Sequence, residues 1–206
     1  MLEIKDFSVA ARDSAVLLDG ISLSVAVGTA VGLTGQSGAG KTTLLKSILG
    51  MLDRQCDITS GEIMVDGSSL YALSQKQRRG LCGTTLGFIP QNPMTAFDSR
   101  VKIKNQMLET LQLRAGLSVL EAQKISMELL SDLGLDHPER VMESYPPQLS
   151  GGMLQRVTVA LLLALNSKYI LADEPTSALD EENRALLLEQ LEKRKNVSGI
   201  LFISHD

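Results

Sequence analysis

The chain has 206 residues, of which 44% are apolar and 21% are charged, the composition of an ordinary globular domain. This length supports one substantial core, or one core with a smaller lobe. The net charge is −4 and no long basic run is present, so we expect no nucleic-acid partner. The longest apolar run, 157–165, is far shorter than the roughly 18 to 20 residues of a membrane span.

Two further features bear on the compartment. The first five residues, Met-Leu-Glu-Ile-Lys, show no basic region followed by an apolar stretch, so we expect no secretory signal and a cytoplasmic location. Cys56 and Cys82 have no C-x-x-C spacing and no nearby histidine. We therefore predict two free thiols, neither a disulfide nor a metal site.

The N-terminal region predicts strands. Residues 2–7 and 21–25 alternate apolar and polar side chains, as half-buried strands do, and we expect the two to pair antiparallel. They lead into a short apolar strand at 30–33.

A phosphate-binding loop follows that strand. The segment fits G-x-x-x-x-G-K-[ST], and its expected nucleotide-binding residues are Gly35, Gln36, Ser37, Gly38, Ala39, Gly40, Lys41, Thr42 and Thr43. The strand at 30–33 and a helical pattern at 42–49 supply the context that this loop needs, which an incidental glycine-rich turn would not. Backbone N–H groups and the helix dipole favour phosphate oxygens there. Lys41 is expected to reach the β- and γ-phosphates, and the Thr42 hydroxyl to ligate Mg²⁺.

The middle of the chain changes character. Residues 60–65 predict a strand closed by an Asp66-Gly67 turn, and 86–89 predict another short strand. From 92 to 149 strand patterns give way to helical periodicity, which indicates an inserted helical lobe.

The clearest helix of this lobe runs from 119 to about 133. Ser118 is its predicted N-cap, Glu121 completes a capping box, and Gly134 is placed to end the helix. After the lobe, Ser150, Gly151 and Gly152 begin a helix at about 153–165. A hydroxyl, several N–H groups and a helix dipole make this helix start a second candidate anion site; the alternative is a simple cap.

Two carboxylates follow the next predicted strand. Residues 169–172 form a continuous apolar run, typical of a central parallel strand, and lead into Asp173 and Glu174. Asp173 is placed to hold Mg²⁺, and Glu174 to orient or deprotonate an attacking water. A charged helix at 181–194 and a buried strand at 200–203 complete the predicted elements.

Taken together these motifs resemble the ATP-binding cassette (ABC) ATPases over nearly the whole chain. Besides the phosphate loop and the two carboxylates, the segment 149–152 is similar to the family signature, and 177–180 is similar to its D-loop. Gln91 and His205 match the Q-loop glutamine and the switch histidine. The resemblance implies that Gln91 senses Mg²⁺ and the γ-phosphate, and that Asp180 and the signature contribute to nucleotide binding.

The resemblance also implies an α/β fold. Its P-loop NTPase core, a mostly parallel sheet with flanking helices and an N-terminal antiparallel part, would comprise 1–91 and 150–206, with the helical lobe at 92–149. ATP and Mg²⁺ are the implied cofactors, and Lys41, Gln91, Glu174 and His205 are the implied catalytic residues. Family members generally continue past the switch histidine, so we expect further chain in the complete subunit.

The implied partners are a second ABC ATPase subunit, identical or related, two transmembrane permease subunits and, indirectly, an extracytoplasmic solute-binding protein. The family usually has glutamine after the two signature glycines, whereas this chain has Met153. In this respect, and over 91–98 and 145–148, the sequence resembles the peptide and nickel importer branch. That branch often pairs two different cassettes. We therefore expect an importer subunit at the cytoplasmic face of the membrane, with peptides or nickel-type complexes as cargo.

One departure concerns the base of ATP. The family tends to stack adenine on an aromatic residue, and the equivalent position here is Ala11. Loss of such a stack, worth about 0.5 to 1.5 kcal/mol, would loosen ATP binding several-fold. Two other functions are open alternatives: a soluble ABC ATPase acting on ribosomes or DNA, and a nucleotide sensor without hydrolysis. The first usually carries two cassettes or a long coiled coil, and the intact Lys41, Asp173 and Glu174 argue against the second.

Overall fold

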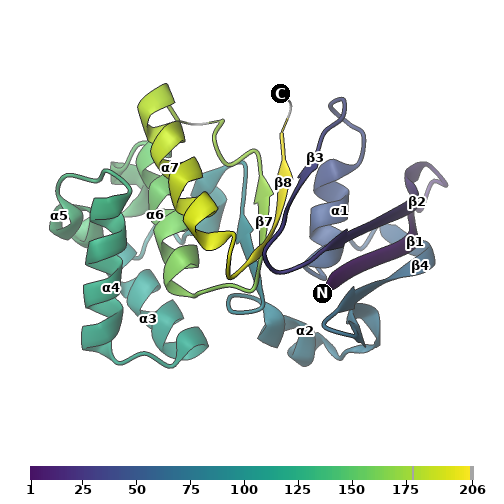
Figure 1. Cartoon of the computed structure of the whole chain (residues 1–206), viewed down its shortest axis with the longest axis horizontal. Helices are drawn as coiled ribbons and strands as arrows, with labels where there is room; N and C mark the ends of the chain where they lie inside the picture. Colours follow the sequence, from purple (N-terminus) through teal and green to yellow (C-terminus); the bar gives the residue numbers. More distant parts are fainter. Residues whose placement is uncertain (178, 205–206) are drawn as a thin grey trace.

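Two sheets and seven α-helices make up residues 1–177 and 179–204, which the computed structural model describes. Helix α1 lies between the antiparallel sheet and the parallel sheet, helices α6 and α7 cover the opposite face of the parallel sheet, and α3 and α4 pack against α6 from outside (Figure 1). Within these residues no helix is both long enough and apolar enough to cross a membrane.

The antiparallel sheet has the order β2-β1-β4-β5. Its strands are β1 (Leu2–Ala11), β2 (Val16–Val25), β4 (Cys56–Val65) and β5 (Ser68–Ser69). The predicted antiparallel pairing of the first two is confirmed, although both are longer than the alternating pattern indicated. A bulge bends β1 at Asp6 opposite Gly61, where a Cβ would lie 2.3 Å from the Asp6 carbonyl oxygen, so only glycine fits. Asp66 and Gly67, with φ of 50° and 81°, form the predicted turn.

The parallel sheet has the order β3-β8-β7-β6. It comprises β3 (Ala30–Leu33), β6 (Leu86–Ile89), β7 (Tyr169–Asp173) and β8 (Gly199–Ile203). Every pairing in it is parallel, so the carboxyl ends of all four strands meet at one edge. This edge, on the side where β3 leads into α1, carries the candidate site.

The helices are α1 (Lys41–Ile48), α2 (Gln75–Leu81), α3 (Ile103–Ala115), α4 (Val119–Asp132), α5 (Pro138–Glu143), α6 (Gly151–Ala164) and α7 (Glu181–Arg194). Of these, α1, α4, α6 and α7 begin and end close to the predicted residues, whereas no bounds were predicted for the other three. The predicted capping box of Ser118 and Glu121 is present at α4. Helix α6 begins earlier than expected, because the Ser150 hydroxyl accepts from the Met153 amide and brings Gly151 and Gly152 into the first turn.

Two hydrophobic clusters lie on the two faces of the parallel sheet. Side chains alternate along β7, so Ile170 and Ala172 join the cluster formed by α3 to α7, whereas Tyr169 and Leu171 join the cluster under the antiparallel sheet and α1. Burial on both faces explains why β7 reads as an uninterrupted apolar run. The clusters fix β7 firmly, and with it the carboxylates at its end.

Candidate active site

The phosphate loop joins β3 to α1 and depends on glycine at two positions. Gly38 and Gly40 both have φ of 83°, a left-handed conformation that glycine adopts without strain. At Gly40 space matters as well, because a Cβ would lie 2.4 Å from the carbonyl oxygen of Leu17 on β2. Gly40 is also the N-cap of α1 and places no side chain over the helix start, which leaves its N–H groups accessible to an anion.

Lys41 and Thr42 attach this loop to the rest of the site. The Lys41 ammonium donates to the carbonyl oxygens of Gly35 (2.5 Å) and Gln36 (2.9 Å), which holds the loop curled around a largely buried cation. The Thr42 hydroxyl donates to Asp173 Oδ2 at 3.0 Å. Two residues that are 131 positions apart in the sequence, both predicted to hold Mg²⁺, are thereby brought together.

Gln91 and Glu174 form the second pair at this edge. They follow the adjacent parallel strands β6 and β7, and the Gln91 Nε2 donates to Glu174 Oε2 at 2.8 Å. Glu174 has a φ of 45°, and its own amide donates to the Ile203 carbonyl oxygen of β8 at 3.2 Å. A positive φ is uncommon for a residue other than glycine, and here it turns the chain sharply after β7.

These groups surround one cavity of about 250 Å³. Leu17, Gln91, Glu174 and the loop residues 37–43, Thr43 among them, line it, and Asp173 adjoins it through Thr42. None of the described residues that line it is aromatic, and Leu17 is its apolar wall. Ala11 ends β1.

The donor set suits a hard divalent cation. A hydroxyl from Thr42, a carboxylate from Asp173 and an amide from Gln91 are oxygen ligands of the kind that Mg²⁺ accepts alongside water and phosphate. In the described part of the chain no group of three or more His, Cys, Asp or Glu side chains could hold a metal ion.

Other predicted site residues lie outside this cavity. Ser150 caps α6, and Gly151 and Gly152 form its first turn. Asp180 caps α7, where its Oδ1 accepts from the Asn183 amide at 2.9 Å and from the Asn183 Nδ2 at 2.7 Å. These two hydrogen bonds lower the pKa of the Asp180 carboxyl. Residues 178, 205 and 206 lie outside the described residues. The predicted switch histidine, His205, is one of them.

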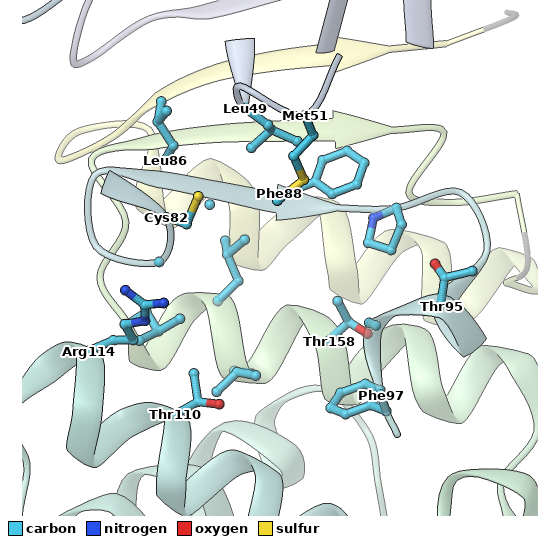
Figure 2. Close-up of a pocket in the computed structure, with 17 residues that line it drawn as sticks. Leu49, Met51, Cys82, Leu86, Phe88, Thr95, Phe97, Thr110, Arg114 and Thr158 are labelled. Carbon is cyan, nitrogen blue, oxygen red and sulfur yellow. The ribbon is translucent and has the colours of Figure 1, made fainter. Parts of the chain in front are cut away.

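A larger cavity of about 480 Å³ lies close to Gln91 (Figure 2). It lies between the parallel sheet and helices α3 and α6, with mostly apolar walls that include Leu49, Met51, Cys82, Phe88, Phe97 and Thr110. Pro90 and Thr95, on either side of the Gln91 segment, also line it. Cys82 and Cys56 are free thiols, as predicted, and burial raises the pKa of Cys82.

Comparison with known proteins identifies the family. The sequence profile of the ABC transporter family matches residues 18–177. The chain is 38% identical to the metal-staphylopine import system ATP-binding protein CntD of Staphylococcus aureus, over 92% of this chain and 70% of that protein. It is 33% identical to the oligopeptide transport ATP-binding protein OppD of Bacillus subtilis, over all of this chain and 59% of that protein. It is 34% identical to the dipeptide transport ATP-binding protein DppD of Escherichia coli, over 92% of this chain and 58% of that protein.

Solved structures give the same result. The ATP-binding cassette MJ0796, in a dimeric post-hydrolysis state bound to ADP and Pi, superposes with a TM-score of 0.87 and 27% identity, over all of this chain and 88% of that one. This chain spans less than two thirds of the peptide-transport relatives it matches. The P-loop fold and the match over more than half of the chain agree, and the chain belongs to the ABC transporter family of ATP-binding proteins.

Proposed function

We propose that this chain is the ATP-binding and ATP-hydrolysing subunit of an ABC importer. The observation that carries the proposal is the meeting of the phosphate loop, the Thr42–Asp173 pair and the Gln91–Glu174 pair around one cavity. Phosphoryl transfer to water requires a phosphate cradle, a metal position and a group that orients the water, and these residues supply all three.

Each residue has a defined role in this proposal. The loop residues 35–43 and Lys41 bind the β- and γ-phosphates through N–H groups and a positive charge. Thr42, Asp173 and Gln91 hold Mg²⁺, which when bound neutralises charge on the phosphates. Glu174 orients the attacking water and accepts its proton. His205 belongs to the same catalytic set by family resemblance.

We further propose that each ATP site is shared between two cassettes. The phosphate loop, Thr42 and Asp173 approach a nucleotide from one side, and the open first turn of α6, with Ser150, Gly151 and Gly152, offers donors for the other side. The structurally similar cassette MJ0796 is dimeric. A second cassette, identical or related, would complete the site with its own signature and the residue equivalent to Asp180.

Crossed variants test the shared site. Lys41→Ala and Ser150→Arg chains should each lack ATPase activity under conditions in which the wild-type cassette dimerises. Their mixture should regain activity, because one of its two sites joins an intact phosphate loop to an intact signature. No activity in mixed dimers shown to be present would contradict sharing. If the native assembly is heteromeric, the second substitution goes into the partner cassette.

The apolar cavity in Figure 2 is our proposed docking site for a permease helix at the cytoplasmic face of the membrane. It lies between the proposed core (1–91 and 150–206) and the proposed lobe (92–149), and Gln91 lies between its lining residues and Glu174. Such a helix would therefore report on the nucleotide through Gln91. Met51→Asp, at an exposed apolar side chain lining the cavity, should reduce co-purification with the permease subunits. Leu113→Asp, at an exposed apolar side chain outside the cavity lining, should not.

For the cargo we propose peptides or chelated metal ions, which follow from the names of the relatives. The test is ATPase activity of the transporter reconstituted with its two permeases and solute-binding protein. A dipeptide, an oligopeptide or a nickel chelate should stimulate turnover. Stimulation by none of these classes would contradict the proposed cargo, and an active cassette that binds no permease would contradict import.

A further inference from the structure

Two consecutive side chains of α6 donate hydrogen bonds to the segment that follows Glu174, one near the start of that segment and one near its end. The Gln155 Nε2 donates to the Pro175 carbonyl oxygen at 3.0 Å, and Gln155 is only 1% exposed. The Arg156 Nη1 donates to Asn183 Oδ1 at 2.8 Å. One helix therefore holds the residue directly after the candidate base and the first turn of α7.

Arg156 also donates hydrogen bonds to the signature turn and to the helical lobe. Its Nε donates to the Gly152 carbonyl oxygen at 3.3 Å, and its Nη1 donates to the carbonyl oxygens of Gly134 (2.7 Å) and Leu133 (3.3 Å), at the end of α4. Burial lowers the pKa of Arg156, and the nearby Asp180 opposes this, so the guanidinium stays charged. Hydrogen bonds from a charged, partly buried donor are stronger than neutral ones.

The segment after Glu174 also contains internal hydrogen bonds. The Ser177 amide donates to the Glu174 carbonyl oxygen at 3.1 Å, and Asp180 Oδ1 accepts from the Asn183 amide at 2.9 Å and from its Nδ2 at 2.7 Å. A continuous set of contacts thus runs from Gly152 through Arg156 and Asn183 to Asp180.

We propose that Gln155 and Arg156 are positioning residues that make the signature turn, residues 174–177 and residues 179–183 move as one unit. When the signature closes on the nucleotide of the facing cassette, this unit sets the Glu174 carboxylate of its own site. The two ATP sites of a dimer are thereby coupled through α6. This inference rests on the shared site proposed above.

Amide hydrogen exchange of the whole chain tests the effect of the Gln155 and Arg156 hydrogen bonds without requiring a dimer. The Arg184 and Asn183 amides both donate to Asp180, and in Arg156→Met they should exchange at least tenfold faster. Gln155→Glu replaces a donor by an acceptor and should speed exchange of the Ser177 amide by a similar factor. Arg140→Met, at an exposed arginine on α5, is the matched control and should leave these rates unchanged. Wild-type exchange in both test variants would overturn the proposal.

Turnover separates positioning from simple stabilisation. In an active dimer, Arg156→Met should lower kcat at least tenfold while the ATP affinity of the single chain stays within twofold, and Arg156→Lys should recover part of kcat. Asn183→Ala removes the same hydrogen bond from the other side, so it serves if Arg156→Met does not fold. Equal losses of binding and turnover would indicate a merely structural role and overturn the proposal.

The proposed shared site and this coupling fail in different ways. If the mixture of Lys41→Ala and Ser150→Arg chains stays inactive, the shared site is wrong, whatever the exchange rates show. If that mixture regains activity while Arg156→Met and Asn183→Ala turn over like the wild type, only the coupling role is wrong.

Discussion

Replacement of Gly40 by alanine probes the most constrained backbone position of the phosphate loop. Two separate costs act there. A φ of 83° in a residue with a Cβ costs about 1–2 kcal/mol. The added Cβ would also lie 2.4 Å from the Leu17 carbonyl oxygen and 2.8 Å from a Leu18 methyl carbon, and such overpacking costs roughly 1–3 kcal/mol more.

Gly38 offers the matched control. It has the same φ of 83°, but a Cβ there meets no atom within 4 Å. Gly38→Ala should therefore lose only about 1–2 kcal/mol of unfolding free energy, whereas Gly40→Ala should lose about 2–5 kcal/mol. The difference of about 1–3 kcal/mol corresponds to roughly 2–12 °C in Tm for a domain of this size.

The assay is denaturant unfolding of the two variants and the wild type, followed by circular dichroism, with ATP absent. Comparison of two glycines with one φ cancels the conformational cost and leaves the contact with β2. Equal destabilisation by the two substitutions would refute the packing of Leu17 against the loop.

Further predictions concern charge and coupling. Lys41→Ala removes the cation from the phosphate site and should weaken ATP binding at least tenfold by calorimetry; unchanged affinity would count against the loop assignment. Gln91→Ala should reduce solute transport more than ATP binding, and full transport in vesicles would contradict its role as a link. Burial raises the pKa of Asp66, but hydrogen bonds from Lys168, the N-terminal amine and Tyr169 together bring that pKa well below its ordinary value of 3.8. The resulting stability is present above about pH 4 and is lost as the pH falls toward the lower, folded-state pKa, so Asp66→Asn should flatten the acid side of the stability curve; an unchanged curve would refute this.

Much of the fold was predictable because local patterns and tertiary burial agree. Helix α7 occupies the predicted 181–194, and the capping box at Ser118 marks the start of α4 as expected. Helix α2 was missed although Ser74 and Gln77 form the same kind of box, because the helix is short and has no buried residue to give a periodic pattern. The extension of β1 to Ala11 was missed because the bulge at Asp6 breaks the alternation.

The site was predictable in its parts and less so in its contacts. Parallel strands place Asp173, Glu174 and Gln91 at one edge of the sheet, which the apolar runs before them indicated. The hydrogen bond between Gln91 and Glu174 joins residues 83 positions apart, and no local pattern encodes it. The approach of Leu17 to the loop was likewise invisible, since it depends on how the antiparallel sheet packs over α1.

Glu174→Gln tests the central claim most directly, by measurement of ATP affinity and phosphate release on the same preparation. Glutamine has nearly the same size as glutamate but cannot accept a proton from water. We expect ATP affinity close to that of the wild type and hydrolysis at least 10²-fold slower, equivalent to about 2.7 kcal/mol of lost transition-state stabilisation. Hydrolysis at the wild-type rate would remove Glu174 from the mechanism and contradict the proposed active site.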